Sequence, residues 1–239
     1  MCFLGSRASI CPRDPDAGAF PGFALTRGET AFMEQVAILI PLIGLGFIMS
    51  ERIRDIVISL LLALFLFPLM VFIGAVIFLV FGCPVLYSEK RVGLGGRPFT
   101  IYKFRTLNGW NAGTEGLFDR IVKNGMPRKS RGGFFQTLRK HSLDELPQLW
   151  NVLRGEMSLV GPRPVPEEEL SYRYGSESMR VVSVRPGLTG LWQVSGRSDL
   201  SPEMRRRLDL DYVARRSGRL DRWIILRTFP AVLSGRGAY

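Results

Sequence analysis

Histidine and paired cysteines are nearly absent from this chain of 239 residues. His141 is the only histidine, so a histidine-based catalytic triad would have to use it, and no Gly-x-Ser-x-Gly nucleophile turn accompanies it. Cys2, Cys11 and Cys83 show none of the paired spacings of a disulfide framework or a zinc site. These absences argue against a serine hydrolase, a disulfide-rich fold and a zinc protein, and they fit a reducing compartment.

Familiar nucleotide-binding loops and a signal peptide are missing too. The glycine-rich stretch 93–98 is followed neither by the Gly-Lys-Ser/Thr of a Walker loop nor by the helix that a dinucleotide fingerprint requires. Residues 1–50 read as an irregular tail whose only apolar segment, Val36 to Met49, is shorter than a full membrane span. The tail has no basic region leading into an apolar core, so it does not resemble a signal peptide.

Acidic residues are scarce where basic residues are many. The chain has a net charge of +11 and a pI near 10.2, and from Cys83 onward 27 Lys plus Arg face 15 Asp plus Glu. Such a surplus predicts an anionic partner: nucleic acid, anionic lipid headgroups or a phosphorylated substrate. Charge by itself does not choose among them.

One long apolar run stands out, from Ile56 to Phe81, with only Ser59, Pro68 and Gly74 as exceptions. A straight helix of this length would measure about 39 Å and could cross a hydrocarbon core of about 30 Å. Pro68 near the middle favours a kink because it removes a main-chain hydrogen bond. Each half, about 18 Å long, would then be long enough to enter one leaflet and return.

Basic residues flank both ends of this run, at Arg52 and Arg54 before it and at Lys90 and Arg91 after it. Since positive flanks favour the cytoplasmic side, both ends are predicted to lie on one face of the membrane. We therefore expect a re-entrant helix-break-helix over 51–82, with an ordinary transmembrane span as the alternative.

The rest of the chain, 83–239, predicts a compact mixed α/β domain, so the fold class is α+β. A mobile basic loop is expected over 108–133, and a turn is expected between Arg185 and Gly190. The predicted ordered elements are strands at Val85–Ser88, Phe99–Phe104 and Met157–Val160, helices at Gln148–Arg154 and after Pro166, and surface-lying basic or apolar helices at Met204–Arg219 and Trp223–Leu233.

The stretch from Ser142 to Pro147 places two adjacent carboxylates, Asp144 and Glu145, at a helix entrance. Ser142 followed three residues later by Glu145 is a capping-box pattern, so Ser142 is predicted to be the N-cap. Pro147 lacks the N–H that an α-helix would need there, and such local conflicts gather at functional sites.

Adjacent carboxylates on a helix point about 100° apart and so do not form a face-sharing acid–base pair. One can act as a nucleophile while the other holds a metal. Mg²⁺ suits this sparse supply, because it commonly binds one or two carboxylates together with substrate phosphates.

Six cationic residues lie next to turns or element ends, where guanidinium and ammonium groups suit a diphosphate substrate. Taken singly, each could instead be a solvated surface charge. Arg163 is the strongest candidate, because prolines on both sides fix its backbone. The six are Lys103, Arg105, Arg139, Arg163, Arg185 and Arg197.

From Glu51 onward the chain resembles the bacterial sugar transferases, the monotopic phosphoglycosyl transferases that act on polyprenyl phosphate. The resemblance is carried by several motifs in order: Lys103-Phe104-Arg105-Thr106, Ser142-Leu143-Asp144-Glu145-Leu146-Pro147-Gln148-Leu149, Asn151-Val152-Leu153, Met157-Ser158-Leu159-Val160-Gly161-Pro162-Arg163-Pro164, Arg185-Pro186-Gly187, Thr189-Gly190, Gln193-Val194, Gly196-Arg197, and Asp209 with Tyr212 and Asp221.

The resemblance implies that Asp144 is a nucleophile that takes a sugar phosphate from a nucleotide diphosphate sugar, uridine being the expected nucleoside. Undecaprenyl or another polyprenyl phosphate would then attack the covalent intermediate, which starts a surface glycan or exopolysaccharide. Glu145 would help hold Mg²⁺, Arg139 would lie near the lipid phosphate, and Pro68 would break the membrane helix. The residues implied to bind substrate are Lys103, Arg105, Arg163, Arg185, Arg197 and Asp209.

The implied partners are a nucleotide sugar, polyprenyl phosphate and the bacterial inner membrane, with the catalytic domain on the cytoplasmic face and no nucleic acid. The oligomeric state is left open. The alternative from another class is a non-enzymatic, membrane-tethered basic protein that binds anionic lipid or nucleic acid. Its affinity would fall steeply with salt and would not depend on Asp144.

Overall fold

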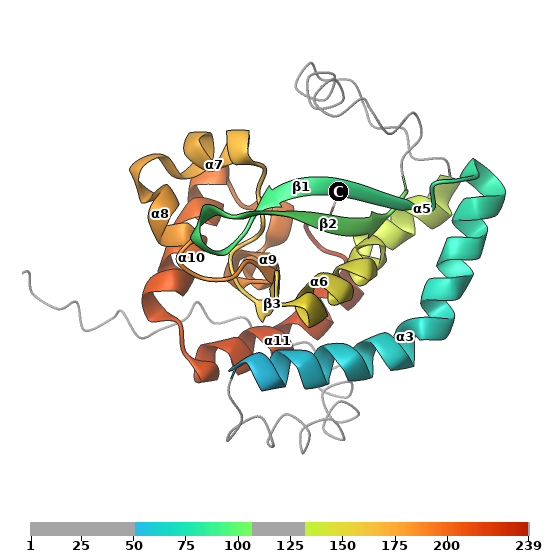
Figure 1. Ribbon diagram of the computed structural model, residues 1–239, viewed down its shortest axis with the longest axis horizontal. Coiled ribbons are helices and arrows are strands. Elements are labelled where there is room, and N and C mark those ends of the chain that lie inside the picture. The colour runs from blue at the N-terminus through green and yellow to red at the C-terminus, as the bar shows by residue number, and fades with distance from the viewer. Residues whose placement is uncertain (1–50, 107–131, 239) are drawn as a thin grey trace, which may run out of the picture. The chain divides into compact units, whose positions relative to one another are not determined.

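The computed structural model describes residues 51–106 and 132–238. The predicted tail over 1–50 and nearly all of the predicted loop over 108–133 lie outside these ranges. Helix dominates the described part, together with two small two-stranded sheets, which agrees with the α+β prediction. Figure 1 shows the elements in order along the chain.

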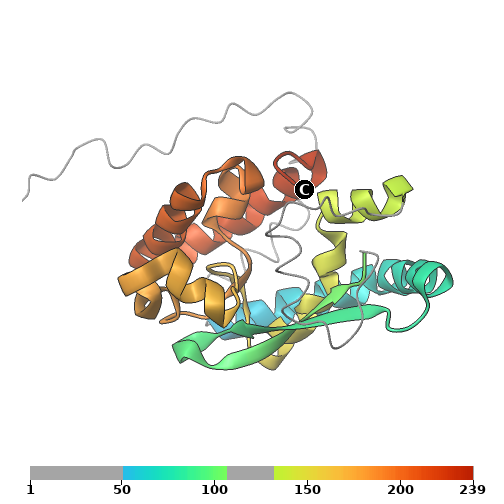
Figure 2. The ribbon, with the colours of Figure 1, turned by 90° about the horizontal axis from the view of Figure 1, so that it is seen from above.

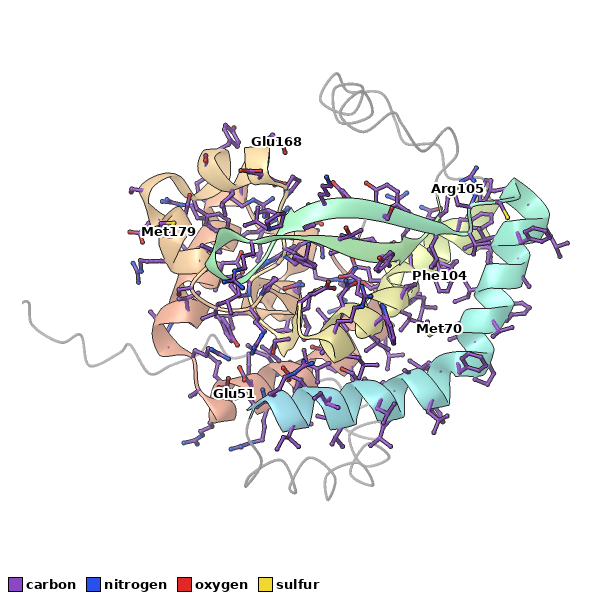
Figure 3. All side chains as sticks on the ribbon, viewed as in Figure 1. Glu51, Met70, Phe104, Arg105, Glu168 and Met179 are labelled. Carbon is purple, nitrogen blue, oxygen red and sulfur yellow. The ribbon has the colours of Figure 1, made fainter. Side chains whose placement is uncertain are left out.

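The apolar run forms one helix, α3 (Glu51–Phe81), with Pro68 inside it. The ribbon of α3 turns sharply around its middle, close to Met70 (Figures 1 and 3), as expected where a proline removes a main-chain hydrogen bond. By length and composition α3 could cross a membrane, and only 11% of its most apolar window is buried. The break thus takes the form of a bend within one helix, and re-entry into the membrane stays a prediction.

Polar side chains attach the start of α3 to the rest of the protein. Arg54 is 6% exposed and pairs with Asp221 at 2.8 Å. Asp55, 2% exposed, accepts a hydrogen bond of 2.6 Å from Ser158. Arg52 donates to the main-chain carbonyls of Val152 and Leu153 at 2.5 and 2.7 Å. The first turns of α3 are therefore held against the domain that follows it.

The second half of α3 packs on one side only. Ile73 and Ile77 are fully buried and form a small core with Phe104, Phe135 and Leu138. Other large apolar side chains of this half, Phe72, Phe78 and Leu79, remain exposed, as do Leu64 and Phe65 before Pro68. A helix that exposes such residues requires an apolar surrounding.

The predicted hairpin is present as β1 (Leu86–Val92) and β2 (Pro98–Phe104), which pair antiparallel. The turn between them contains η2 (Leu94–Gly96), where Gly95 has φ +67°, a conformation that favours glycine. Figure 2 shows this hairpin along the side of the domain opposite the C-terminal helices.

Downstream of the hairpin, the predicted helix entrance differs from expectation. Helix α5 (Gly132–Lys140) leads to η3 (Leu143–Gln148), a 3₁₀ segment, and only then to α6 (Leu149–Arg154). Ser142 is not a side-chain N-cap: it adopts a left-handed conformation, φ 52°, and makes no capping hydrogen bond. The chain forms a 3₁₀ turn here because Pro147 has no N–H for the hydrogen bond to Leu143 that an α-helix would need. A 3₁₀ turn instead joins residues three apart. Gly155 ends α6 as predicted.

A second sheet forms where a turn was predicted. Strand β3 (Ser158–Val160) was expected, but β4 (Gly187–Thr189) pairs with it in parallel, so the prediction of a simple turn between Arg185 and Gly190 is wrong. The pairing depends on glycine, since a Cβ at Gly187 would lie 2.0 Å from the main-chain nitrogen of Gly161. Sequence periodicity gives no signal for a three-residue strand whose partner lies far along the chain.

Helices complete the domain around the main core. The helix predicted over Met204–Arg219 is divided at Arg216, because Ser217 caps a new helix. The remaining elements are α7 (Glu167–Tyr174), η4 (Gly175–Glu177), α8 (Ser178–Val181), α9 (Leu191–Ser195), η5 (Arg197–Asp199), α10 (Pro202–Arg215) and α11 (Gly218–Ser234).

The main core joins β2, α6, β3, α9, α10 and α11 through buried apolar side chains. Val152, Met157 and Ile224 are fully buried at its centre. Burial of such side chains contributes about 1.5 to 3 kcal/mol each. The two carboxylates depend on the smaller core instead, because Leu143 and Leu146 of η3 pack against the cluster of Ile73, Ile77, Phe104, Phe135 and Leu138.

Candidate active site

The two adjacent carboxylates lie in the first turn of η3. The left-handed conformation of Ser142 turns the chain from α5 into η3, which is uncommon for a residue other than glycine. The Ser142 hydroxyl accepts a hydrogen bond from Arg197, whose other amino group donates to the Lys140 carbonyl at 3.1 Å. Arg197 therefore fixes the turn that presents Asp144 and Glu145.

Glu145 is held between two cations. Its Oε1 atom accepts hydrogen bonds from Lys103 Nζ at 2.7 Å and from Arg163 at 2.9 Å. Burial by itself would raise the pKa of Glu145, but the positive charges of Arg163 and Lys103 outweigh it and hold that pKa well below its usual range. Glu145 is thus a permanent negative charge.

Asp144 has the opposite character. Burial and the neighbouring charge of Glu145 raise its pKa to about 6, although Lys103 and Arg163 partly oppose the shift. No hydrogen bond joins its side chain to another described side chain. Two adjacent carboxylates whose pKa values are driven apart by their surroundings indicate two different chemical roles.

Arg163 is fixed by more than its flanking prolines. Its guanidinium lies 5.9 Å from the ring of Trp192, and Arg205 lies 5.4 Å from the same ring. Stacking on an indole favours one orientation of the guanidinium. The expectation that Arg163 faces a site agrees with its ion pair to Glu145.

Asp209 lies close to Arg163 but is only 1% exposed. It accepts a hydrogen bond of 2.8 Å from the Tyr174 hydroxyl, and burial raises its pKa to about 7. Nearby, burial and Asp209 together raise the pKa of Tyr174. This placement favours positioning of the Arg163 loop; direct substrate binding by Asp209 stays a prediction.

The structure does not gather all the predicted cations at the carboxylates. Arg105 lies by the end of α3, where its guanidinium is 5.5 Å from the Phe81 ring and 3.3 Å from the Pro84 carbonyl. Arg185 donates to the carbonyl of Gly155 at 3.1 Å. Arg139 is in the last turn of α5, three residues before Ser142. Pro68 lies within α3, in the bend.

Three further residues border this site and were not predicted from the sequence as site residues. Trp192 stacks on Arg163, and Arg91 and Gln148 line a small cleft beside Lys103 and Arg163. Strand alternation could have indicated Arg91, because it shares one face of the hairpin with Lys103. Gln148 carried no such signal, since its direction depends on the 3₁₀ turn.

The donors available for a metal are few. Within 51–106 and 132–238 no three Asp, Glu, His or Cys side chains cluster as a protein-only metal cage. Both cations bind the same oxygen of Glu145, so Oε2 has no hydrogen bond to a described residue. That oxygen and the Asp144 carboxylate fit Mg²⁺, which commonly takes one or two carboxylates plus substrate phosphates.

A long apolar helix next to a carboxylate pair set among cations is typical of a membrane-associated enzyme that acts on phosphate groups. The sequence profile described as "Bacterial sugar transferase" matches residues 47–235. The chain therefore belongs to the bacterial sugar transferase family, and it is a phosphoglycosyl transferase, as its sequence motifs predicted.

Individual relatives agree. The chain is 41% identical over 205 residues to "Exopolysaccharide production protein ExoY" of Rhizobium meliloti (strain 1021), covering 80% of this chain and 88% of the relative. It is 39% identical over 199 residues to "UDP-glucose:undecaprenyl-phosphate glucose-1-phosphate transferase" of Caulobacter vibrioides, covering 80% and 72%. It is 40% identical over 202 residues to "Undecaprenyl-phosphate galactose phosphotransferase" of Salmonella typhimurium, covering 79% and 41%.

Proposed function

We propose that this protein transfers a sugar 1-phosphate from a nucleoside diphosphate sugar, with uridine as the nucleoside, to undecaprenyl or a related polyprenyl phosphate. The carrying observation is the carboxylate pair in η3, in which Glu145 is neutralised by Lys103 and Arg163 while Asp144 is left without a side-chain partner. The names of the relatives from Caulobacter vibrioides and Salmonella typhimurium support this substrate class.

In the first step, an oxygen of Asp144 attacks the phosphorus that carries the sugar. The bond from this phosphorus to the oxygen bridging the two phosphates breaks, and nucleoside monophosphate leaves with the bonding pair. The product is a covalent aspartyl phosphosugar. Lys103 and Arg163 stabilise the negative charge that accumulates on the transferred and leaving groups.

In the second step, a phosphate oxygen of the polyprenyl phosphate attacks the same phosphorus. The bond to Asp144 breaks, the carboxylate is regenerated, and polyprenyl diphosphate sugar is released. A nucleophile that must also leave benefits from a pKa near neutrality, because a very weak base attacks poorly and a strong base leaves poorly.

Glu145 Oε2 and Asp144 would hold Mg²⁺ together with substrate oxygens. When bound, the ion supplies charge neutralisation on the diphosphate. Lys103 and Arg163 keep Glu145 ionised, which suits a carboxylate that serves as a metal ligand.

The bend in α3 and the exposed apolar residues on its second half support a re-entrant anchor in the inner membrane, with the catalytic domain on the cytoplasmic face. Polyprenyl phosphate would then reach Asp144 along this half of α3. The product would start assembly of an exopolysaccharide or surface glycan, as the name of the Rhizobium meliloti relative suggests.

Asp144→Asn tests the mechanism, because an amide cannot form the aspartyl phosphosugar. Nucleoside monophosphate release from a panel of sugar nucleotides is expected to fall by at least about a thousandfold, as for removal of other covalent nucleophiles. Intact-mass analysis of the wild type with donor and no lipid should find a phosphosugar adduct on Asp144.

Asp211→Asn is the matched control, since it makes the same change of charge at a residue of α10 that pairs with Arg215. It should retain wild-type release. Undiminished release by Asp144→Asn, or no adduct under saturating donor, would show that the assigned mechanism is wrong.

A further inference from the structure

A small cleft opens beside the ion pairs of Glu145. Its polar lining comes from Arg91, Lys103, Gln148 and Arg163, and Ile101 and Leu188 are among its apolar neighbours. Two of these cations, Lys103 and Arg163, also bind Glu145. The cleft is therefore continuous with the active site, yet Arg91 and Gln148 have no part in the carboxylate pair.

The strand register directs Arg91 toward this cleft. In the hairpin, Arg91 pairs with Phe99, Glu89 with Ile101, and Tyr87 with Lys103. Residues two apart share a face of a strand, so Arg91 and Lys103 lie on the same face as Ile101, which is 1% exposed. This is the face that packs on the domain.

The guanidinium of Arg91 has a hydrogen-bond donor that no described residue uses. One amino group donates weakly to the Pro164 carbonyl at 3.4 Å, and the other pairs with Glu89. Its Nε is buried without a hydrogen-bond partner in the described structure. A buried donor that lacks a partner costs about 1 to 3 kcal/mol, which a ligand oxygen would relieve.

Gln148 is the second unused polar group. The residue is 3% exposed and lines the cleft, and its side chain has no hydrogen bond to another described residue. Its NH₂ group can donate to an oxygen held by the neighbouring cations.

Three cations and an amide donor around one cleft match the oxygens of a phosphate. Two phosphates could supply them: that of the leaving nucleotide and that of the lipid acceptor. Lys103 lies opposite Tyr87 near the start of β1, which follows the membrane helix directly, whereas Arg91 is four residues further along the strand, about 13 Å away. The cleft thus extends along the hairpin away from the C-terminal end of α3, the half of the helix along which we propose that the lipid reaches Asp144.

We propose that Arg91 and Gln148, together with Lys103 and Arg163, form the subsite for the phosphate of the departing nucleoside monophosphate, an inference that rests on the proposed function. As the bridging bond breaks, this phosphate gains negative charge. Arg91 and Gln148 stabilise it there, while the sugar phosphate stays on Asp144.

Arg91→Gln in full-length protein reconstituted in nanodiscs tests the subsite. We expect the KM for the sugar nucleotide and the inhibition constant for uridine monophosphate to rise together by about tenfold, with no change in the KM for polyprenyl phosphate. Arg91→Lys, which keeps the charge, should recover part of the loss. Gln148→Glu, which adds a negative charge to the cleft, should weaken the binding of uridine monophosphate and so raise its inhibition constant in the same way.

Arg97→Gln is the control, because this substitution removes the same charge from an exposed residue at the turn of the same hairpin. It should leave all three constants unchanged.

If Arg91→Gln keeps the wild-type donor KM, or raises the KM for polyprenyl phosphate instead, the subsite is wrongly assigned while the proposed function stands. If the wild type releases no nucleoside monophosphate from any sugar nucleotide, the proposed function itself fails. If Arg91→Gln does not fold, the inhibition constants for uridine monophosphate are measured on Arg91→Lys and Gln148→Glu instead. Wild-type values in both variants would show that the subsite is wrongly assigned.

Discussion

At the scale of single residues, Asp144 and Glu145 differ in what their charges do to stability. The pKa of Asp144 is raised from 3.8 to about 6 in the folded protein, so the folded state binds its proton more tightly than the unfolded state does. Stability therefore falls as pH rises from about 4 to 6 and stays lower above that range.

Asp144→Asn should stabilise the detergent-solubilised protein at pH 7.5 by about 1 to 2 kcal/mol, because it removes an ionised group that burial disfavours. The gain should disappear as pH falls toward 4. Chemical denaturation at pH 7.5 and at pH 4.5 measures both values. A variant that is less stable than wild type at pH 7.5 would contradict the raised pKa.

Glu145→Gln should do the reverse. It leaves Lys103 and Arg163 without their carboxylate, so stability at pH 7.5 should fall by about 1 to 3 kcal/mol. Because the pKa of Glu145 is lowered, this loss should persist to a pH well below 4 wherever the fold survives. The same denaturation series serves as the measurement, and equal effects of the two variants would show that the two environments do not differ.

The raised pKa of Asp144 also predicts the pH dependence of the reaction. Only the ionised carboxylate attacks, so kcat/KM for the sugar nucleotide should drop on the acid side with a midpoint near pH 6. Nucleoside monophosphate release at low donor concentration, followed from pH 5 to 8, gives this midpoint. A flat profile would contradict an ionisation of Asp144 in this range.

At the scale of elements, the bend in α3 leads to a prediction about membrane topology. If α3 re-enters, Glu51 at its start and Cys83 just beyond its end lie on the same side of the membrane. Cys83 is exposed and serves as a natural label. In a background with Cys2 and Cys11 replaced by serine, Cys83 and an introduced Glu51→Cys should both react from the cytoplasmic side alone.

Pro68→Ala supplies the comparison, since it restores the main-chain hydrogen bond that favours a straight helix. It should increase labelling of one of the two positions from the opposite side and should lower activity. Labelling of Glu51→Cys and Cys83 from opposite sides without the Pro68 change would establish an ordinary span instead.

At the scale of the whole molecule, a buried ionic network joins the membrane helix to the C-terminal helices. Arg54 contacts Asp221, and Asp221 also accepts a hydrogen bond of 2.8 Å from the Tyr212 hydroxyl. Asp221 and Tyr212 are each 1% exposed. Residues far apart in the sequence therefore depend on one another for charge neutralisation.

Arg54→Met should destabilise the protein by about 3 to 5 kcal/mol, because it leaves the buried Asp221 without its cation. The double variant Arg54→Met/Asp221→Asn should recover a large part of this loss. Thermal or chemical unfolding in nanodiscs provides the cycle, and Arg219→Met, at an exposed arginine on the same helix as Asp221, is the comparison. Strictly additive single effects would show that the pair is not coupled.

The sequence by itself determined the features that depend on short-range pattern. A long apolar run with a central proline predicts a bent membrane helix, and alternating residues around glycines predict the hairpin, because each pattern lies within a short stretch of sequence. The motifs around Asp144 and Arg163 likewise identified the family and the two principal charges of the site.

The tertiary structure decided what depends on contacts between distant segments. It replaced the Ser142 cap by a left-handed turn that Arg197 holds, paired β4 with β3 through Gly161 and Gly187, and buried Asp209 beneath Arg163. It also gave Asp144 and Glu145 opposite pKa shifts, since these depend on burial and on cations supplied by β2 and the β3 loop. Local sequence pattern does not predict these pKa shifts, because tertiary packing brings the residues that surround a buried carboxyl group together from distant parts of the chain.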